Sequence, residues 1–278
     1  MLTRSQIVEL LDRHGLSPSR ALGQNFVADP NTVRRIARLA GVGAGDHVVE
    51  IGAGLGSLTL ALVETGAAVT AVELDRHLLP VLRDVVAGQG VEVVEGDAAE
   101  LDWDAVLAAA DRWSLVANLP YNVATPLVLD LLDDVPAIAR MLVMVQREVG
   151  ERLAAPPGSG AYGIPSVKVA YHATASVVGR VPATVFVPKP RVESVLVRIE
   201  RRAGGPATDA DPDRLFALVR AGFGQRRKML RRSLAGQVDE GAFASAGVRP
   251  EARAEELGVE DWGRLAAAAP AAPQNSRQ

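Results

Sequence analysis

The 278-residue chain contains no cysteine, so disulfide bonds, thiolate metal sites and cysteine nucleophiles are excluded. Aromatic residues make up only 4% of the sequence, while the hydrophobic fraction of 48% is ordinary for a globular protein. No apolar run approaches the roughly 18 residues that suggest a membrane-spanning helix. The N-terminus carries Arg4, Glu9 and Arg13 and lacks the apolar core of a signal peptide. We therefore expect a cytoplasmic protein with no membrane partner.

Lysine is scarce too, because the basic residues are nearly all arginine. A coding bias explains that excess more simply than selection for phosphate binding. The net charge of −3 gives no overall signal for nucleic-acid binding, although an average over the chain can hide a local patch. The histidines have no metal-ligand spacing, so we expect no metal site; they are His14, His47, His77 and His172.

Strand-like and helix-like segments alternate from Asp46 to about Glu200. The apolar runs that predict strands are His47–Ile51, Ala68–Leu74, Val91–Val94, Ser114–Ala117 and Met141–Val145. The helical patterns between them are Ser57–Glu64, Arg76–Val86, Asp104–Ala110 and Thr125–Leu132. This alternation predicts an α/β fold with a parallel sheet covered by helices on both faces. No clear helix separates the β-rich runs Val167–Val181 and Ser194–Ile199, so we expect them to pair antiparallel at the end of the sheet.

A second, smaller domain follows the linker-like run Ala203–Thr208. Leu215, Val219 and Phe223 then fall at helical spacing, and short helices continue to about Leu265. We predict a first domain over residues 1–202, a small all-α domain over 209–266 and a disordered tail over 267–278.

Glycines cluster where the first predicted strand ends, in the run Glu50-Ile51-Gly52-Ala53-Gly54-Leu55-Gly56-Ser57. Such glycines let the backbone approach a ligand closely at the first strand-to-helix turn. The dinucleotide fingerprint has a glycine where this chain has Ser57. The spacing, preceded by the acid Glu50, favours S-adenosylmethionine over NAD and disfavours an NAD-linked oxidoreductase. The alternative is a tight turn that binds no ligand.

Acids follow the second and third predicted strands. Glu73 is placed to accept hydrogen bonds from ribose hydroxyls, and Asp97 from an adenine amino group. NAD and S-adenosylmethionine share a ribose, so Glu73 does not separate them. Capping of helices or loops remains the alternative, above all for Asp75. Ligand-type groups at successive strand ends nevertheless favour a binding site at that edge of the sheet.

The next predicted strand ends in Asn118-Leu119-Pro120-Tyr121. Asn118 offers an amide oxygen as acceptor, Pro120 fixes the backbone direction, and Tyr121 offers a stacking face. This combination can hold the amine of a nucleobase and present it for alkylation. Upstream, Gln24 and Asn25 beside Phe26 either close over a cofactor or start a helix.

A basic run lies in the smaller domain, with five cations and no acid between Phe223 and Leu234; they are Arg226, Arg227, Lys228, Arg231 and Arg232. On a helix, the pairs four residues apart repel one another, and a phosphate backbone would relieve that repulsion. The alternative is an ordinary solvated surface. The acidic stretch from Asp239 to Asp261 hides the run in the net charge.

Taken together, these segments resemble one family, the ribosomal RNA adenine N6-dimethyltransferases. The resemblance runs from about Arg20 to Leu234 and rests on Leu22–Phe26, Glu50–Thr59, Gly96-Asp97, Asn118–Asn122 and Val185–Ser194. It implies a Rossmann-like class I methyltransferase sheet, mostly parallel with one antiparallel strand near the end. It also implies S-adenosylmethionine as methyl donor, no metal, and a monomer that acts on 16S rRNA of the small ribosomal subunit. The implied reaction dimethylates N6 of two neighbouring adenosines.

The resemblance also assigns site residues by position. Cofactor contacts fall on Gln24, Asn25, Val27, Gly52, Gly54, Glu73, Asp97 and Asn118. The substrate adenine would meet Asn118, Pro120 and Tyr121, with Phe186 stacking on its other side. Asn118 and a backbone carbonyl near Pro120 would orient the adenine amine, with no strong base required. The five cations of the basic run would contact RNA.

Three alternatives to this assignment stay open. The first is a macrolide-resistance enzyme, which methylates adenine in large-subunit rRNA. Those enzymes usually carry isoleucine at the position of Leu119, so Leu119 favours the small subunit. A non-catalytic RNA-binding assembly or transcription factor on the same fold is the second alternative, and intact Asn118, Tyr121 and Asp97 oppose it. The NAD-linked oxidoreductase is the third, disfavoured as above.

Overall fold

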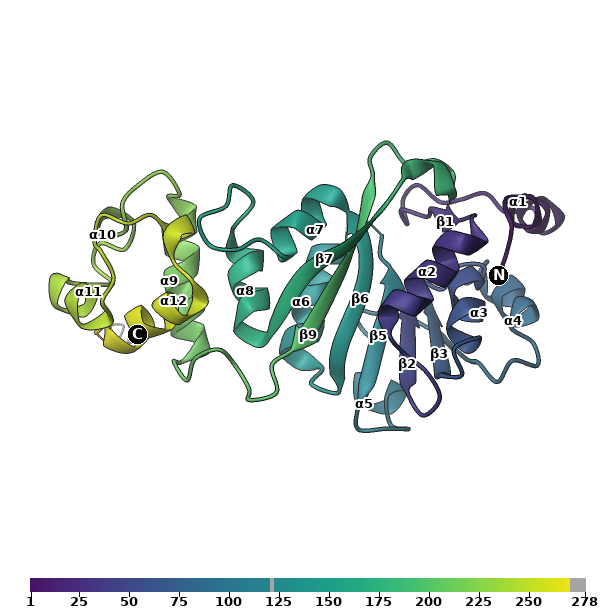
Figure 1. Ribbon diagram of the computed structural model, residues 1–278, viewed down its shortest axis with the longest axis horizontal. Helices are drawn as coiled ribbons and strands as arrows, with labels where there is room; N and C mark the ends of the chain where they lie inside the picture. The colour runs from purple at the N-terminus through teal and green to yellow at the C-terminus, as the bar shows by residue number, and fades with distance from the viewer. Residues whose placement is uncertain (121–122, 271–278) are drawn as a thin grey trace, which may run out of the picture. The chain divides into compact units, whose positions relative to one another are not determined.

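The computed structural model describes residues 1–120 and 123–270, which divide into two compact units (Figure 1). The first unit comprises Met1–Glu151 and Ala175–Arg201, and the second comprises Arg152–Thr174 and Arg202–Gln278. The predicted boundary near residue 202 agrees with this division. The structure differs in one respect, because residues 152–174 belong with the C-terminal helices and not with the first domain.

Within the described residues, the first unit is built on a seven-stranded sheet in the order β4-β3-β2-β5-β6-β9-β7. Its strands are β2 (His47–Ile51), β3 (Ala68–Glu73), β4 (Glu92–Glu95), β5 (Trp113–Asn118), β6 (Ile138–Gln146), β7 (Ala173–Val181) and β9 (Ser194–Arg201). β2 pairs parallel with β3 and β5, β3 with β4, and β5 with β6, while β9 runs antiparallel to β6. The predicted fold class, a mostly parallel sheet with an antiparallel part at one end, is confirmed.

Helices on both faces of the sheet explain why its central strands are so apolar (Figure 1). The helices that begin in the first unit are α1 (Arg4–Arg13), α2 (Pro30–Ala40), α3 (Ser57–Val63), α4 (Leu79–Val85), α5 (Trp103–Val106), α6 (Ala124–Asp134) and α7 (Arg147–Leu153). Side chains of α2 and α3 share one buried cluster with Val48 of β2 and Val116 of β5. Because β2, β3, β4, β5 and β6 run parallel, their carboxyl ends lie at the same edge of the sheet, where the loops that lead into the helices meet.

The prediction of a β run over Val167–Val181 was wrong in its first half. Residues Ile164–His172 form helix α8, and strand β7 begins only at Ala173. Pro165 fits the first turn of a helix, and the Ser166 hydroxyl accepts a hydrogen bond from the N–H of Gly163. Val167 and Tyr171 lie four residues apart and are both buried in the core of the second unit, so helical spacing prevailed over β propensity.

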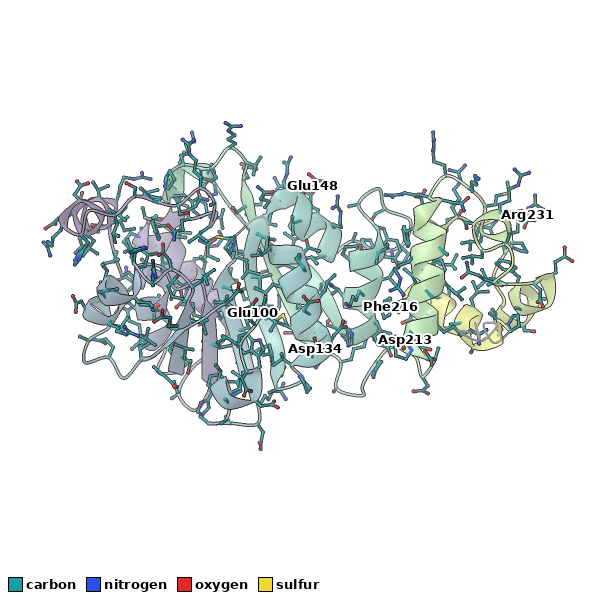
Figure 2. All side chains as sticks on the ribbon, turned by 180° about the vertical axis from the view of Figure 1, so that it is seen from behind. Glu100, Asp134, Glu148, Asp213, Phe216 and Arg231 are labelled. Atoms are coloured by element: carbon teal, nitrogen blue, oxygen red, sulfur yellow. The ribbon has the colours of Figure 1, made fainter. Side chains whose placement is uncertain are left out.

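The second unit is helical in its described part beyond the linker. Its further helices are α9 (Pro212–Gly224), α10 (Leu230–Ser233), the 3-10 turn η2 (Ala254–Glu256), α11 (Glu240–Ala246) and α12 (Val259–Ala268). Its core forms around the fully buried Trp262, and Phe216 of α9 packs at the edge of this core with its ring against Tyr171 (Figure 2). A side chain at Gly222 would have its Cβ only 2.6 Å from the Trp262 ring, so the close packing of α9 on α12 needs glycine there.

The prediction of a disordered tail over residues 267–278 was wrong for its first residues. Helix α12 continues to Ala268, and Ala269 is buried against the same core. Alanine is both a good helix former and small enough to be packed, so the Ala-rich composition that suggested disorder fits a helix end equally well. Residues 271–278 of the predicted tail lie outside the described residues.

Candidate active site

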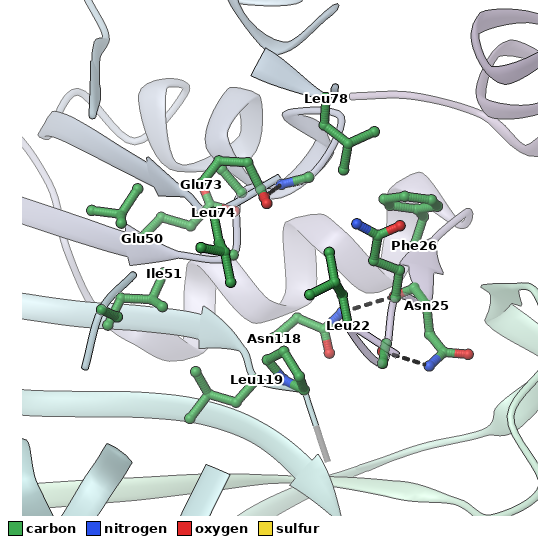
Figure 3. A pocket seen from close by; sticks show the side chains of 18 of the residues that line it. Leu22, Asn25, Phe26, Glu50, Ile51, Glu73, Leu74, Leu78, Asn118 and Leu119 are labelled. Carbon is green, nitrogen blue, oxygen red and sulfur yellow. Dashed lines mark hydrogen bonds between the residues drawn. The ribbon is translucent and has the colours of Figure 1, made fainter. Parts of the chain in front are cut away.

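A cavity opens at the carboxyl ends of β2, β3, β4 and β5, under the segment Ala21–Val27 (Figure 3). Most of the predicted cofactor and substrate residues line it together. They are Gln24, Asn25, Val27, Gly52, Gly54, Glu73, Asp97, Asn118 and Pro120. Side chains from segments far apart in the sequence therefore converge at the edge where open parallel sheets bind ligands.

The glycine run makes a tight turn between β2 and α3. Gly52, Gly54 and Gly56 all have positive φ angles, of 73°, 58° and 83°, which other residues rarely adopt. At Gly54, a Cβ atom would also lie 3.0 Å from the ring of Phe26. The turn thus presents bare backbone to the cavity, and the aromatic ring of the covering segment lies directly against it.

Glu73 ends β3 with its carboxyl group held by backbone. One oxygen accepts the N–H of Gly54 at 2.7 Å and the other the N–H of Asp75 at 2.8 Å. Burial raises the pKa of Glu73, these two N–H groups oppose the rise, and the charge of Asp75 adds to it. A carboxylate oxygen can accept more than one hydrogen bond, so the fixed carboxyl can still receive a ligand hydroxyl.

Glu50, in β2, also lines the cavity, and the sequence drew attention to it only as the acid before the glycines. Its side chain is 2% exposed, and Oε2 has no hydrogen-bond partner in the described part of the chain. Burial is the main reason that its pKa rises to about 8; the Thr59 hydroxyl opposes the rise, and the nearby charge of Glu73 adds to it.

Asn118 ends β5 with its amide group turned by a specific contact. Its Nδ2 donates to the backbone oxygen of Asn25 at 2.9 Å, across 93 residues of sequence (Figure 3). Because one side of the amide is used in this way, the orientation of Oδ1 is set as well, and within the described residues Oδ1 has no donor and remains an acceptor. The predicted acceptor role of Asn118 thus has a structural basis that the motif alone did not contain.

The Pro120 carbonyl accepts hydrogen bonds from the protein's own backbone. It accepts the N–H groups of Val123 and Ala124 and so begins helix α6. This carbonyl therefore turns the chain at the cavity wall. The expected contact of an adenine amine with a backbone carbonyl near Pro120 stays a prediction. Tyr121 and Asn122 lie outside the described residues.

The segment that covers the cavity is fastened at Gln24. The side-chain amide of Gln24 accepts the N–H of Ser19 and donates to Oδ2 of Asp75, each at 2.8 Å. Both ends of this amide are therefore used within the protein, and Gln24 holds the segment to the end of β3. Asn25 similarly donates to the backbone oxygen of Gly23, which keeps its own carbonyl directed at Asn118.

The N-terminal helix also reaches this region. The N–H of Leu2 donates to the Ser57 hydroxyl at 3.2 Å, at the start of α3. Arg4 donates to the backbone oxygen of Thr184 at 2.7 Å, and the fully buried Ile7 lines the cavity. Helix α1 is thus part of the cavity wall, a role that no sequence motif signalled.

Asp97 follows β4 and lines the cavity, with Oδ1 accepting the N–H of Ala99 at 3.0 Å. This geometry serves a turn and a ligand equally well, so its adenine contact stays a prediction.

Phe186 does not meet the other predicted site residues at the cavity. It is fully buried, and it pairs with Val27 where β8 (Phe186–Val187) runs antiparallel to β1 (Phe26–Val27). Its ring packs in the core with residues of α2, including Val33. In this structure Phe186 supports the strand that covers the cavity and offers no stacking face, because strand pairing turns its ring inward.

The basic residues of the second unit lie on a turn and not on one helix. Helix α9 ends at Gly224 and α10 begins at Leu230, so the predicted helical pairs four residues apart are wrong. Backbone bonds from Leu230 to Ala252 and from Lys228 to Gln225 fix this connection. We call residues Gln225–Arg232 the basic segment.

Its cations differ in how they are held. Arg226 contacts Glu255 at 2.6 Å and donates to the backbone of Gly160, and Arg231 pairs with Glu251 at 3.4 Å (Figure 2). All five cations are exposed, but Arg227, Lys228 and Arg232 have no ion pair within the described residues. These three are therefore better placed than Arg226 to meet an external anion.

The described residues, 1–120 and 123–270, contain no cluster of three or more acidic, histidine or cysteine side chains that could hold a metal ion. None of their helices combines the length and apolarity required to cross a lipid bilayer.

Comparison with protein families gives one match along most of the chain. The family described as ribosomal RNA adenine dimethylase matches residues 16–269. A protein of Kineococcus radiotolerans named ribosomal RNA small subunit methyltransferase A is 49% identical over 280 residues, which cover 97% of this chain and 92% of that one. The protein of the same name from Leifsonia xyli subsp. xyli is 48% identical, with 96% and 98% coverage.

Solved structures share the fold. A dimethyladenosine transferase from Plasmodium falciparum superposes with a TM-score of 0.73 at 24% identity, covering 85% of this chain and 94% of that one. The 23S rRNA methyltransferase ErmE superposes with a TM-score of 0.69 at 26% identity, covering 87% and 98%.

Proposed function

Because this chain belongs to the ribosomal RNA adenine dimethylase family, we propose that it dimethylates N6 of two neighbouring adenosines in 16S rRNA of the small ribosomal subunit. It is an rRNA adenine N6,N6-dimethyltransferase that uses S-adenosylmethionine. The observation that carries the assignment of the site is the Asn118 amide. It is turned by the Asn25 carbonyl so that, among the described residues, its oxygen remains available for a donor in the cavity.

The cavity suits S-adenosylmethionine on its own residues. The glycine turn exposes backbone without side chains to the cavity, and a Cβ at Gly54 would meet the ring of Phe26. Glu73 is held where a ribose hydroxyl can donate to it, and Asp97 lies beyond it on the neighbouring strand end. The acids that line the cavity, including the unpartnered Glu50, complement a cofactor that carries positive charge.

When bound, S-adenosylmethionine supplies an electrophilic methyl group. The chain's own contribution is orientation, since an adenine N6 lone pair is delocalised into the ring and is a poor nucleophile. An N6–H hydrogen bond to Oδ1 of Asn118 directs that nitrogen and favours a tetrahedral geometry. Orientation can contribute up to roughly 7–11 kcal/mol to barrier lowering. The alkylated nitrogen is acidic and loses its proton readily, so Asn118 acts as an orienting group and not as a base.

RNA would be held by the second unit. Arg227, Lys228 and Arg232 are exposed cations within a short stretch, which suits a phosphate backbone. We propose that the protein acts as a cytoplasmic monomer on the small subunit, with the first unit performing methyl transfer and the second contacting RNA. The small subunit is preferred over the large one because identity to the two small-subunit enzymes is 49% and 48%, against 26% to ErmE.

A labelling experiment tests the proposal. The protein is incubated with methyl-labelled S-adenosylmethionine and unmodified small subunits, large subunits or naked rRNA, and the label is then mapped. We expect label on two adjacent adenosines of 16S rRNA. Label on the large subunit alone would overturn the small-subunit assignment, and no label on any substrate would favour a non-catalytic RNA-binding factor.

A further inference from the structure

Glu50 is a buried acid that the orientation of adenine does not require. Its side chain is 2% exposed, lines the cavity, and leaves Oε2 without a hydrogen-bond partner in the described residues. A carboxylate buried in this way loses its hydration, and the Thr59 hydroxyl offsets that loss only in part, which favours the neutral acid.

The groups that face Glu50 reinforce this preference. From β3 comes Glu73, which is itself buried, and from α3 comes the neutral hydroxyl of Thr59. The remaining charged side chain of the cavity lining is Asp97, so the described lining contains acids and no lysine, arginine or histidine. Burial raises the pKa of Glu50 to about 8, with Thr59 opposing and Glu73 adding to the rise.

We propose that Glu50 holds a proton in the free protein and releases it when the positively charged cofactor enters the cavity. The O–H bond of the carboxyl group breaks, the proton passes to solvent, and the remaining negative charge faces the positive charge of S-adenosylmethionine. Cofactor binding is therefore coupled to the release of a proton. This inference rests on the proposed function, because it takes its cation from that cofactor.

Proton release fixes the direction in which the affinity for S-adenosylmethionine changes with pH. Below the pKa of the free protein, binding must remove the proton, so the affinity for S-adenosylmethionine rises with pH until about pH 8. Between pH 6 and pH 7 the expected increase in affinity is roughly tenfold. In Glu50→Gln the neutral side chain cannot release a proton, so its affinity stays level across this range.

Titration calorimetry at pH 7, in buffers that differ in ionisation enthalpy, measures the proton count directly. We expect release of roughly 0.9 proton per S-adenosylmethionine bound to the wild-type protein. We expect almost none with the uncharged analogue 5′-methylthioadenosine, or with Glu50→Gln. Glu92→Gln removes an exposed acid from the start of β4 and serves as the matched control, with a count like that of the wild type.

Binding without proton release, or equal release with the uncharged analogue or the glutamine variant, would overturn the proposal. If Glu50→Gln fails to fold, the wild-type protein alone remains decisive, since a level affinity for S-adenosylmethionine between pH 6 and pH 8 also contradicts it. These results differ from failure of the proposed function, for which S-adenosylmethionine would produce no binding at all.

Discussion

The cavity of the first unit and the basic segment of the second hold their polar groups in opposite ways. In the cavity, Glu73, Asn118 and Gln24 are each fixed by hydrogen bonds, with backbone partners for Glu73 and Asn118. In the basic segment, Arg227 and Lys228 project from a turn into solvent. Chemistry at a single nitrogen needs direction, and fixed groups provide it, whereas attraction to a phosphate backbone tolerates movement.

The two regions differ in charge as well. The described cavity lining contains acids and no basic side chain, while the basic segment contains cations and no acid. Each region therefore attracts a different ligand, a cationic cofactor in one and a polyanion in the other. Variants that damage one region should leave the function of the other intact, and the following predictions test that separation.

The largest effect is expected at Asn118. Asn118→Ala removes the amide oxygen that orients the adenine amine, so methyl transfer should fall by about 100-fold or more. Affinity for S-adenosylmethionine should fall much less, as measured by calorimetry. Asn31→Ala makes the same change on the exposed start of α2 and serves as the control. Full activity of Asn118→Ala would refute the orienting role.

A smaller effect is expected at Gly54. Gly54→Ala places a Cβ against the Phe26 ring in a backbone conformation with φ of 58°, so cofactor affinity should fall by roughly tenfold, or about 1.4 kcal/mol. Gly88→Ala is a matched control, because φ there is 73° and no atom lies within 4 Å of the added Cβ. Both variants place alanine at a positive φ angle. If they bind the cofactor with equal affinity, the glycine turn does not form the binding surface.

Removal of two exposed cations should act on RNA alone. The double variant Arg227→Ala with Lys228→Ala should weaken small-subunit binding and lower the slope of affinity against salt by about two. Cofactor affinity should stay the same. Binding curves at several salt concentrations measure the slope, and an unchanged slope would identify these cations as ordinary surface charge.

The smallest effect is expected at Arg226. Its pair with Glu255 is partly exposed, so Arg226→Ala should cost at most about 1 kcal/mol of folding stability. Its effect on the salt slope should be smaller than that of Arg227→Ala, because Arg226 is already engaged. Denaturant unfolding and the same salt titration give both values, and an equal slope change would show that ion pairing does not separate Arg226 from the unpaired cations.

The sequence predicted the parallel part of the sheet because its strands are short, apolar and separated by glycine-marked turns. It also brought Gly52, Glu73 and Asn118 to one edge, since parallel strands end together. The helix α8 was missed because Val167 and Tyr171 suit a strand until the second unit provides a core for them. The burial of Phe186 could not be foreseen, because it depends on pairing with Val27, far away in sequence.

The contacts made by Asn118 and Gln24 escaped prediction for the same reason. A motif identifies an amide, but only the folded chain determines which side of that amide is used within the protein. Sequence therefore indicated the chemistry of the site well, and its orientation poorly.

The attachment of helix α1 has a practical consequence. Leu2 contacts Ser57, Arg4 contacts Thr184 and Ile7 lines the cavity, so the first residues of the chain are attached beside the cavity. A purification tag fused ahead of Met1 would crowd these contacts and loosen the wall beside the glycine turn. Material intended for binding measurements should carry its tag at the opposite end of the chain.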